Sequence, residues 1–487
     1  MSNGHQRALV VVFDALRPEF VTPEIMPNLH RFATDGVRFL NSRSTFPTET
    51  RVNQSAVTTG CYPARHGIVA NRFVLENDGT AHVLDTGDDV QFEASLNKMT
   101  ERLFDVPTLG ERLTAAGKSC ATISAGTSGG GRLINISAEE TGAFRLALRR
   151  PDAAVPDGIM TEIVKELGPL PDYALPANDW ISYAVDCYLE FVEPRIKPDA
   201  MLLWLCEPDE SFHQRGIGSE DALVAIRHVD AEFGRILKHH ADQIADGTLQ
   251  IVGLSDHGQI SIRGEALDLA TRLTAAGFDA VAEQSKTPDV SVVVANAGGI
   301  WLRQPTPDRI VEITQWLQMQ DWCGPLFTRD GASGTLRHAQ IGIEHRRAPD
   351  IAMVLRYDHE SNEWGHKGMS LHNSGYPIGC GCHGGLSSHE LHNFLTMSGS
   401  AFKEKREIAS PTGNVDILPT VLHLLGVAHP EGIDGRILHE ALRNGPDEQS
   451  IEIAEKTYSS SNDRGPVTHL SVSEVAGTKY INQAWVE

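Results

Sequence analysis

The sequence is short of cysteine, of aromatic side chains and of long apolar runs. Its 487 residues contain seven scattered cysteines, and aromatic residues make up 6% of the chain. An odd and widely spaced set of cysteines does not indicate a disulfide framework, so we expect reduced thiols. No apolar stretch approaches the roughly 20 residues that a membrane-spanning helix requires, so we expect no membrane partner.

Basic residues are scarce relative to acidic ones. The chain has 42 Lys and Arg against 64 Asp and Glu, which gives a net charge of −22 at pH 7. An acidic surface disfavours polyanions, so we expect no nucleic acid polymer as a partner. The polar segment 1–7 leads directly into the first apolar run and leaves no room for a secretory signal. We therefore expect a cytoplasmic protein.

Short apolar runs separated by helical patterns predict an α/β fold. Apolar runs bounded by polar residues are typical of buried strands in a parallel sheet, so we expect a large mainly parallel sheet with helices on both faces. The predicted parts are a catalytic core of residues 1–259 and 346–440, a Gly- and Pro-rich excursion from the sheet at about residues 125–177, an inserted smaller α+β cap lobe of residues 260–345, and a C-terminal extension of residues 441–487 packed on the core. The core sheet is predicted to resume at residues 351–356.

Three of the apolar runs end in acidic residues, and this repetition carries most of the functional information. Residues 8–13 run into Asp14, residues 201–206 are followed by Asp209 and His213, and residues 250–255 run into Asp256 and His257. Because catalytic groups collect at the carboxyl ends of parallel strands, we expect these side chains in one crevice. Carboxylates crowded together require cations, so the pattern predicts a metal site.

The residue types and their spacing narrow the choice of metal and of nucleophile. Asp209 and His213 are four residues apart, which places them on one face of a helical turn. Mixed Asp and His ligands favour Zn²⁺, with Mn²⁺ or Fe as alternatives, over ions that prefer oxygen-only shells. A hydroxyl beside such an ion at a helix start becomes a better nucleophile. From the residues alone, Thr45, Thr48 and Thr50 are equal candidates.

Several segments in a fixed order resemble the alkaline phosphatase superfamily. Within it, the chain is most similar to the type I phosphodiesterase/nucleotide pyrophosphatase branch. The resemblance is carried by residues 10–18, 50–71, 207–213, 255–258, 381–384 and 414–422. It implies an alkaline phosphatase-like fold and a metal-dependent hydrolase that cleaves a phosphodiester or nucleotide-like phosphoester.

The same resemblance implies two metal ions and a nucleophile. One ion would be held by Asp209, His213 and His383, and the other by Asp14, Asp256 and His257, with Thr50 facing both. In that family the threonine attacks phosphorus to form a covalent phospho-threonine, which water then hydrolyses. Asn71 matches the position whose amide holds a phosphoryl oxygen together with the backbone N–H after the nucleophile.

Alternatives remain for the substrate. Residues 61–65 fit the pattern in which sulfatases modify a cysteine, but the register of the segment selects Thr50 over Cys61. Arg51 replaces an aromatic residue common in nucleotide pyrophosphatases, and the segment after His383 is similar to phosphonoacetate hydrolases, which cleave a carbon–phosphorus bond. A phosphomonoesterase and a non-catalytic metal- or phosphate-binding protein are the other rivals. We expect a small organophosphorus substrate, and a homo-oligomer stays open.

Overall fold

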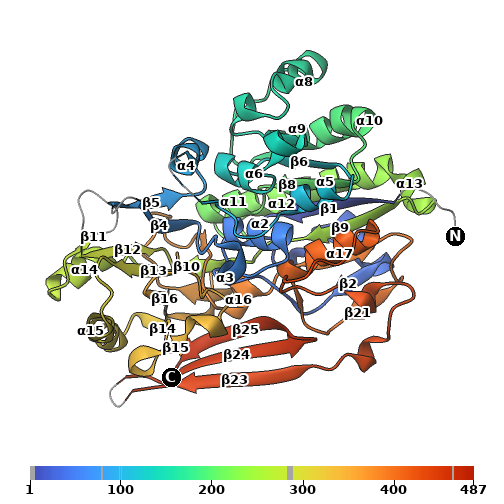
Figure 1. The fold of residues 1–487 in the computed structure, drawn as a ribbon. Helices are drawn as coiled ribbons and strands as arrows, with labels where there is room; N and C mark the ends of the chain where they lie inside the picture. Colours follow the sequence, from blue (N-terminus) through green and yellow to red (C-terminus); the bar gives the residue numbers. More distant parts are fainter. Residues whose placement is uncertain (1–5, 78–79, 98, 100, 282–288, 463–464) are drawn as a thin grey trace.

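An eight-stranded sheet runs through the middle of the protein (Figure 1). The computed structural model describes residues 6–77, 80–97, 99, 101–281, 289–462 and 465–487. In spatial order the strands are β21 (Arg406–Ile408), β2 (Val37–Phe39), β20 (Leu395–Ser398), β9 (Leu249–Leu254), β1 (Arg7–Phe13), β8 (Ala200–Leu205), β6 (Cys120–Ser124) and β7 (Phe144–Ala147). Strands β9 to β7 form a continuous parallel block, and β20 runs antiparallel to both of its neighbours.

Helices cover both faces of this sheet because successive side chains of a strand point to opposite sides. Leu9, Val11 and Phe13 of β1 belong to one apolar cluster, and Val10 and Val12 belong to another. The first cluster includes residues of α1 (Pro27–Asp35), α9 (Asn178–Asp186) and α12 (Glu220–His239), and the second includes residues of α2 (Thr50–Thr59), α5 (Leu109–Ala115) and α17 (Ile417–Leu424). The predicted fold class is confirmed.

Helix α12 illustrates how the sequence builds these layers. Ser219 caps its N-terminus by accepting a hydrogen bond from the Ala222 N–H at 3.2 Å. Its apolar stripe includes Phe233, whose ring meets Phe13 of β1 and Phe32 of α1 edge-on at centroid distances of 5.5 and 5.3 Å. Burying each such ring contributes about 1.5–3 kcal/mol, so the stripe fixes α12 against the sheet.

A second sheet lies in the inserted lobe. Its order is β11 (Ala280–Val281), β12 (Val290–Val294), β13 (Ala297–Leu302), β16 (Ile351–Leu355), β14 (Cys323–Thr328) and β15 (Leu336–Arg337), with α14 (Leu269–Ala275) and α15 (Pro307–Gln318) beside it. The prediction that residues 351–356 return to the core sheet is therefore wrong. A five-residue apolar run fits either sheet, and only the pairing of β16 with β13 and β14 assigns it.

Part of the predicted excursion at residues 125–177 belongs to the core sheet. Strand β7 lies within it and pairs with β6 in parallel. Helices α6 (Ser128–Leu133), α7 (Ala138–Thr141) and α8 (Ile159–Leu167) complete the segment. The prediction of an excursion from the sheet is thus only partly correct, because the four-residue strand β7 is too short to stand out among the surrounding glycines and prolines.

The C-terminal segment forms a separate antiparallel sheet at the bottom of Figure 1. It consists of β23 (Ala454–Ser460), β24 (Thr468–Val475) and β25 (Thr478–Val486). Leu470 and Ile481 of this sheet share an apolar cluster with Phe46 of the core and Phe327 of the lobe. The extension therefore packs on both parts of the chain rather than on the core alone.

The remaining elements connect these sheets. They are α3 (Pro63–His66), α4 (Asp89–Leu96), α10 (Glu193–Arg195), α11 (Asp209–Arg215), α13 (Ala241–Ala245), α16 (Ser388–Leu391), the hairpin β4 (Arg72–Asn77) and β5 (Thr80–Asp85), the pair β3 (Ser42–Arg43) and β22 (Thr412–Gly413), and the small sheet of β17 (Tyr357–Ser361), β18 (Lys367–Ser370), β10 (Ile260–Ile262) and β19 (Gly381–Cys382). Within the described ranges, none of the helices is long and apolar enough to cross a membrane.

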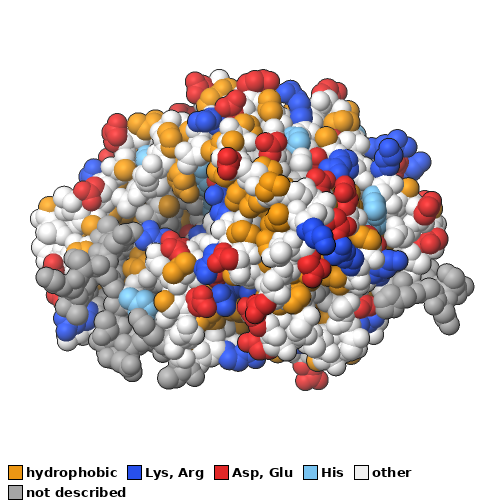
Figure 2. Space-filling view, turned by 90° about the horizontal axis from the view of Figure 1, so that it is seen from above, with side chains coloured by type: hydrophobic (Ala, Val, Ile, Leu, Met, Phe, Trp, Pro, Cys, Tyr) orange, Lys and Arg blue, Asp and Glu red, His pale blue; other side chains and the backbone are white. Residues whose placement is uncertain are grey.

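Two features predicted from composition can be located in the structure. All seven cysteines lie in the described part of the chain, and each is buried and free. This confirms the expectation of unpaired thiols. Figure 2 shows acidic and basic side chains interspersed over one face of the molecule. The net negative charge is therefore not gathered into a single patch on that face.

Candidate metal centre and nucleophile

The predicted site residues lie where neighbouring strands end. Asp14 follows β1, Asp209 begins α11 just after β8, and Asp256 and His257 follow β9. Because β9, β1 and β8 are adjacent and parallel, their carboxyl ends bring these groups together. The other predicted residues come from elements packed over this edge: Thr50 from the start of α2, Asn71 from the start of the β4 hairpin, His213 from α11 and His383 from the segment after β19.

Short distances join the carboxylates and imidazoles. His257 Nε2 lies 3.3 Å from Asp256 Oδ2 and 3.7 Å from Asp14 Oδ1. Asp209 Oδ1 lies 3.3 Å from His213 Nε2 and 3.6 Å from His383 Nε2. The ligand atoms of Asp14, Asp256 and His257 all lie within 4.8 Å of one another. The same holds for those of Asp209, His257 and His383. His257 belongs to both sets, whereas the resemblance assigns it to the first alone and places His213 in the second.

All three imidazoles are held in the same tautomer. Each Nδ1 lies within hydrogen-bond distance of a backbone carbonyl, which can only accept, so Nδ1 carries a proton and the Nε2 lone pair is free whenever the ring is neutral. The three pairs are His213 with Gly381 at 2.8 Å, His257 with Gly258 at 3.0 Å and His383 with Thr48 at 2.8 Å. This arrangement is typical of metal-binding histidines.

In each of the carboxylates of Asp14 and Asp256, one oxygen accepts hydrogen bonds from the protein and the other oxygen faces the site. Asp14 Oδ2 accepts a hydrogen bond from Trp204 Nε1 at 2.9 Å, and Asp256 Oδ1 accepts from the Ala15 and His257 N–H groups at 3.0 Å. Asp14 Oδ1 and Asp256 Oδ2 are buried and have no hydrogen-bond partner among the described residues. Buried carboxylate oxygens require partners, so these two atoms fit a cation.

The electrostatics of the site also favour cations. Burial raises the pKa of Asp14 well above its usual range, and repulsion from Asp256 and Asp209 adds to this effect. Burial likewise raises the pKa of Asp256. Burial lowers the pKa of His383 well below its usual range, which keeps its imidazole neutral. The neighbouring Asp209 carboxylate, by contrast, raises the pKa of His213. Mutually repelling carboxylates beside the neutral His383 imidazole form a ligand set that positive ions would stabilise.

The geometry separates Thr50 from Thr48. The Thr50 hydroxyl oxygen lies 3.1 Å from His257 Nε2, so its O–H donates to the free lone pair there. Thr50 is the first residue of α2, with Glu49 at the N-cap position, so it does not cap the helix. The Thr48 hydroxyl is instead bonded to backbone groups of Gly384 and Gly385 at 3.0 Å. Thr50 is thus the threonine whose hydroxyl meets the candidate metal ligands.

Asn71 lies beside the nucleophile but in an unexpected arrangement. The Arg51 backbone N–H donates to Asn71 Oδ1 at 2.9 Å. The Asn71 N–H in turn donates to the Glu49 carboxylate. The resemblance assigns the Arg51 N–H and the Asn71 amide together to a phosphoryl oxygen, but here they bond to each other. Asn71 Nδ2 is the donor left for a substrate.

Three residues near the site were not singled out from the sequence. Trp204 supports Asp14, Gln259 donates to Asp209 Oδ1 at 2.5 Å, and the Tyr376 ring stacks on His213 at a centroid distance of 4.0 Å. Gln259 follows Asp256 by three residues, and this proximity in the chain is a signal that could have found it. Trp204 lies inside an apolar strand and Tyr376 in a loop, so neither carries such a signal.

The cysteine of the sulfatase-like pattern is remote from this chemistry. Cys61 follows the C-terminal end of α2, whereas Thr50 begins it. Ten helical residues span roughly 15 Å. Burial raises the pKa of the Cys61 thiol to about 12, so it remains protonated and packed. Cys61 thus lies at the end of α2 away from the candidate ligands, and the choice of Thr50 as nucleophile stays a prediction.

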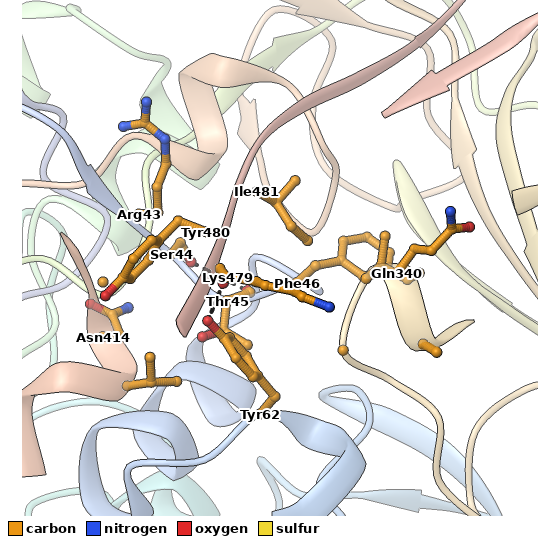
Figure 3. A pocket seen from close by; sticks show the side chains of 15 residues that line it. Arg43, Ser44, Thr45, Phe46, Tyr62, Gln340, Asn414, Lys479, Tyr480 and Ile481 are labelled. Atoms are coloured by element: carbon orange, nitrogen blue, oxygen red, sulfur yellow. Dashed lines mark hydrogen bonds between the residues drawn. The ribbon is translucent and has the colours of Figure 1, made fainter. Parts of the chain in front are cut away.

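A cavity of about 60 Å³ lies between the core and the C-terminal sheet (Figure 3). Thr45 and Asn414 line it from the core, and Tyr480 and Ile481 line it from β25. None of the eight predicted site residues lines this cavity. Asn414 Nδ2 donates to the backbone carbonyl of Asp256 at 2.5 Å. Asn414 thus lines the cavity and also supports the backbone of a candidate metal ligand.

The known proteins to which this chain is similar include phosphodiesterases and nucleotide pyrophosphatases. A venom phosphodiesterase of Macrovipera lebetinus is 22% identical over 275 residues, which are 55% of this chain and 28% of that protein. Ectonucleotide pyrophosphatase/phosphodiesterase family member 1 of Mus musculus is 23% identical over 256 residues, covering 51% of this chain and 24% of the relative. The chain thus spans about a quarter of the length of these curated relatives.

Solved structures and a family comparison extend this similarity. The structure of murine ectonucleotide pyrophosphatase/phosphodiesterase 5, an inactive variant in complex with AMP, superposes with a TM-score of 0.61 at 16% identity, covering 90% of this chain and all of that one. Its fold is therefore shared. The family described as type I phosphodiesterase/nucleotide pyrophosphatase matches residues 8–340. The chain belongs to the type I phosphodiesterase/nucleotide pyrophosphatase family, as the resemblance in its sequence indicated.

Proposed function

We propose that this chain is a metal-dependent hydrolase that cleaves a phosphodiester or nucleotide-like phosphoester through a phospho-threonine intermediate. One observation carries the proposal: the Thr50 hydroxyl lies 3.1 Å from His257 Nε2, the atom shared by both sets of candidate ligands. Family membership supports a phosphoester substrate. The AMP bound to the structural neighbour supports a nucleotide-like group.

The ligand sets fit two divalent cations, which we propose to be zinc, with manganese or iron as alternatives. When bound, such ions neutralise charge on the phosphoryl group and stabilise its entering and leaving oxygens. As the resemblance in the sequence implies, Asp14, Asp256 and His257 would hold one ion, and Asp209, His213 and His383 the other.

The protein's own residues then position the reaction. The Thr50 hydroxyl oxygen lies 3.1 Å from His257 Nε2, so it would stand beside the ion that this lone pair holds. As the bond from Thr50 Oγ1 to phosphorus forms, the bond from phosphorus to the leaving oxygen breaks, and the hydroxyl proton passes through solvent to that leaving oxygen. Water then cleaves the bond between Thr50 and phosphorus and regenerates the hydroxyl. Asn71 Nδ2 would donate to a non-bridging oxygen.

Arg51 favours a second candidate, hydrolysis of the carbon–phosphorus bond in a small phosphonate that also carries a carboxylate. Its guanidinium has no hydrogen bond or ion pair with any described residue, and Arg51 Nε is buried without a partner. The guanidinium rests against Gly87, where an added Cβ would lie 3.2 Å from an Arg51 terminal nitrogen. An unpaired, half-buried guanidinium next to the nucleophile suits a second anionic group.

Substrate turnover separates these candidates. The zinc-loaded chain should release p-nitrophenol from bis-p-nitrophenyl phosphate faster than from p-nitrophenyl phosphate, and should release little phosphate from phosphonoacetate. Thr50→Ala should keep its metal and lose at least about 1,000-fold in kcat, since the nucleophile is removed. Dominant turnover of phosphonoacetate would favour the second candidate, dominant turnover of the monoester would favour a phosphomonoesterase, and unchanged hydrolysis by Thr50→Ala would contradict the threonine mechanism.

We also propose that the protein acts in the cytoplasm on a small organophosphorus substrate. The seven free, buried cysteines support a reducing compartment. Cell fractionation with an antibody against the chain tests this location, and recovery in the extracellular fraction would contradict it.

A further inference from the structure

Gln259 links the two chain segments that supply ligands to the two proposed metal ions. It follows Asp256 and His257 in the chain and is fully buried. Its side-chain Nε2 reaches across to α11, where it donates to Asp209 Oδ1 at 2.5 Å and approaches the Asp209 carbonyl oxygen at 3.4 Å. The segment after β9 thus contacts, through one amide, a carboxylate presented after β8.

The other side of the same amide lies against Gly381, and its Oε1 is buried without a hydrogen-bond partner among the described residues. A Cβ on Gly381 would lie 2.0 Å from Gln259 Oε1, so this glycine makes room for the amide. The Gly381 carbonyl accepts the hydrogen bond from His213 Nδ1 at 2.8 Å. Gln259 therefore contacts both the Asp209 carboxylate and the backbone residue that orients the His213 imidazole.

The backbone of Gln259 is anchored as well. Its carbonyl oxygen accepts a hydrogen bond from the Arg17 guanidinium at 3.1 Å, and the same guanidinium nitrogen donates to the Lys367 carbonyl at 3.1 Å. Arg17 is itself buried, with 2% of its surface exposed. The amide therefore acts from a fixed point rather than from a mobile loop.

We propose that Gln259 is a positioning residue that holds Asp209 in the orientation required by the ion bound at Asp209, His213 and His383. The inference rests on the proposed two-metal function. The amide donates to the carboxylate and adds no charge, so it offsets the repulsion that Asp209 meets from Asp14 and Asp256. Partners of this kind, one step away from the metal, orient the ligands and tune their affinity.

Zinc titration of the full-length chain against a chromophoric chelator tests the proposal with a readout that is independent of activity. Gln259→Met keeps the length of the side chain but removes the donor. We expect this variant to lower the binding affinity for one of the two zinc ions by about 10–100-fold and to leave the affinity for the other unchanged. Gly381→Ala should lower the affinity for the same ion, because its added methyl group displaces the Gln259 amide from the side opposite Asp209.

Gln250→Met is the matched control. Gln250 is also fully buried, but it lies near the opposite end of β9, where its Nε2 contacts the Gly247 carbonyl and the Ser400 hydroxyl at 3.0 and 3.1 Å. We expect this variant to bind both ions with wild-type affinity. If Gln259→Met does not fold, Gly381→Ala carries the test alone, with circular dichroism reporting its folded state.

Two results would overturn the role of Gln259 while leaving the proposed function intact. Wild-type affinity for both ions in the folded Gln259 or Gly381 variant would show that Asp209 needs no such support. An equal loss of affinity for both ions would show that the residue acts on the fold as a whole. If the wild-type chain itself binds no zinc, the two-metal function fails, and this inference fails with it.

Discussion

The position of one proton on each imidazole determines what the site can bind. Backbone carbonyls at Gly381, Gly258 and Thr48 each hold an Nδ1–H, so the three Nε2 atoms face the acidic residues as lone pairs. A bound cation would use those lone pairs, and a protonated imidazole would repel it. The same backbone contacts that fix the rings thus prepare them as ligands.

His66 shows the opposite use of a buried imidazole, as a neutral structural group. Its Nδ1 accepts a hydrogen bond from the Ile68 N–H at 3.1 Å, so that nitrogen is unprotonated. Burial lowers the pKa of His66 to about 3, and the neighbouring His345 and Arg347 add to the effect. The ring therefore stays neutral in the folded protein at pH values where it is charged in the unfolded chain.

This difference predicts how stability depends on pH. The folded pKa of about 3 lies below the ordinary value of 6.5, so the unfolded chain binds more protons and stability falls as the pH drops below 6.5. His66 alone should account for about 2 kcal/mol of lost unfolding free energy between pH 6.5 and 5. Urea unfolding of wild type and His66→Gln at several pH values measures it. Parallel pH curves for the two proteins would contradict the assignment.

Individual contacts near the site could be predicted from the sequence only where the chain itself supplies the proximity. Asp256 and His257 are neighbours, and Asp209 and His213 share a helical turn, so their convergence follows from strand and helix periodicity. The contact of Trp204 with Asp14 joins residues 190 positions apart. Nothing in either segment specifies such a contact, because it depends on how β1 and β8 pair.

At the scale of elements, helix α6 is positioned by glycines. Gly129, Gly130 and Gly131 are buried within it, and a Cβ on Gly129 would lie 2.2 Å from the Thr86 carbonyl oxygen. The Gly129 N–H donates to the Gly87 carbonyl at 3.0 Å. The helix backbone thus packs directly on the end of the β4–β5 hairpin, which a larger residue would prevent.

Gly129→Ala should therefore separate α6 from the hairpin and destabilise the protein by about 1–3 kcal/mol, the usual cost of overpacking a buried contact. Thermal unfolding of the metal-free chain measures this as a lower Tm. Gly375→Ala is the control, because nothing lies within 4 Å of a Cβ at that position. Equal Tm values for the two variants would show that the contact between α6 and Thr86 is not tight.

Elements are predictable where a periodic pattern is long enough and ambiguous where it is short. The run into Asp14 predicts β1, and the stripe of α12 predicts a helix of twenty residues. Strand β16 has five residues and could pair in either sheet, so its assignment to the lobe needed the structure. Strand β7 has only four residues and lies in a Gly- and Pro-rich segment, so its sequence does not predict a strand.

For the whole molecule, the site depends on parts of the chain that lie far apart. The central sheet aligns Asp14, Asp209 and Asp256 at one edge, and His383 arrives from the small sheet beside the inserted lobe. The Asn296 side chain of the lobe donates to Glu390 at 2.8 Å, and Glu390 accepts from the Gly385 N–H at 2.7 Å. The lobe therefore supports the His383 segment.

Anomalous X-ray diffraction from zinc-saturated crystals tests the central claim most directly. The account predicts two zinc peaks about 4 Å apart, one at Asp14, Asp256 and His257 and the other at Asp209, His213 and His383, with the Thr50 hydroxyl beside both. Saturated crystals without zinc at these residues, or with zinc only elsewhere on the surface, would contradict it.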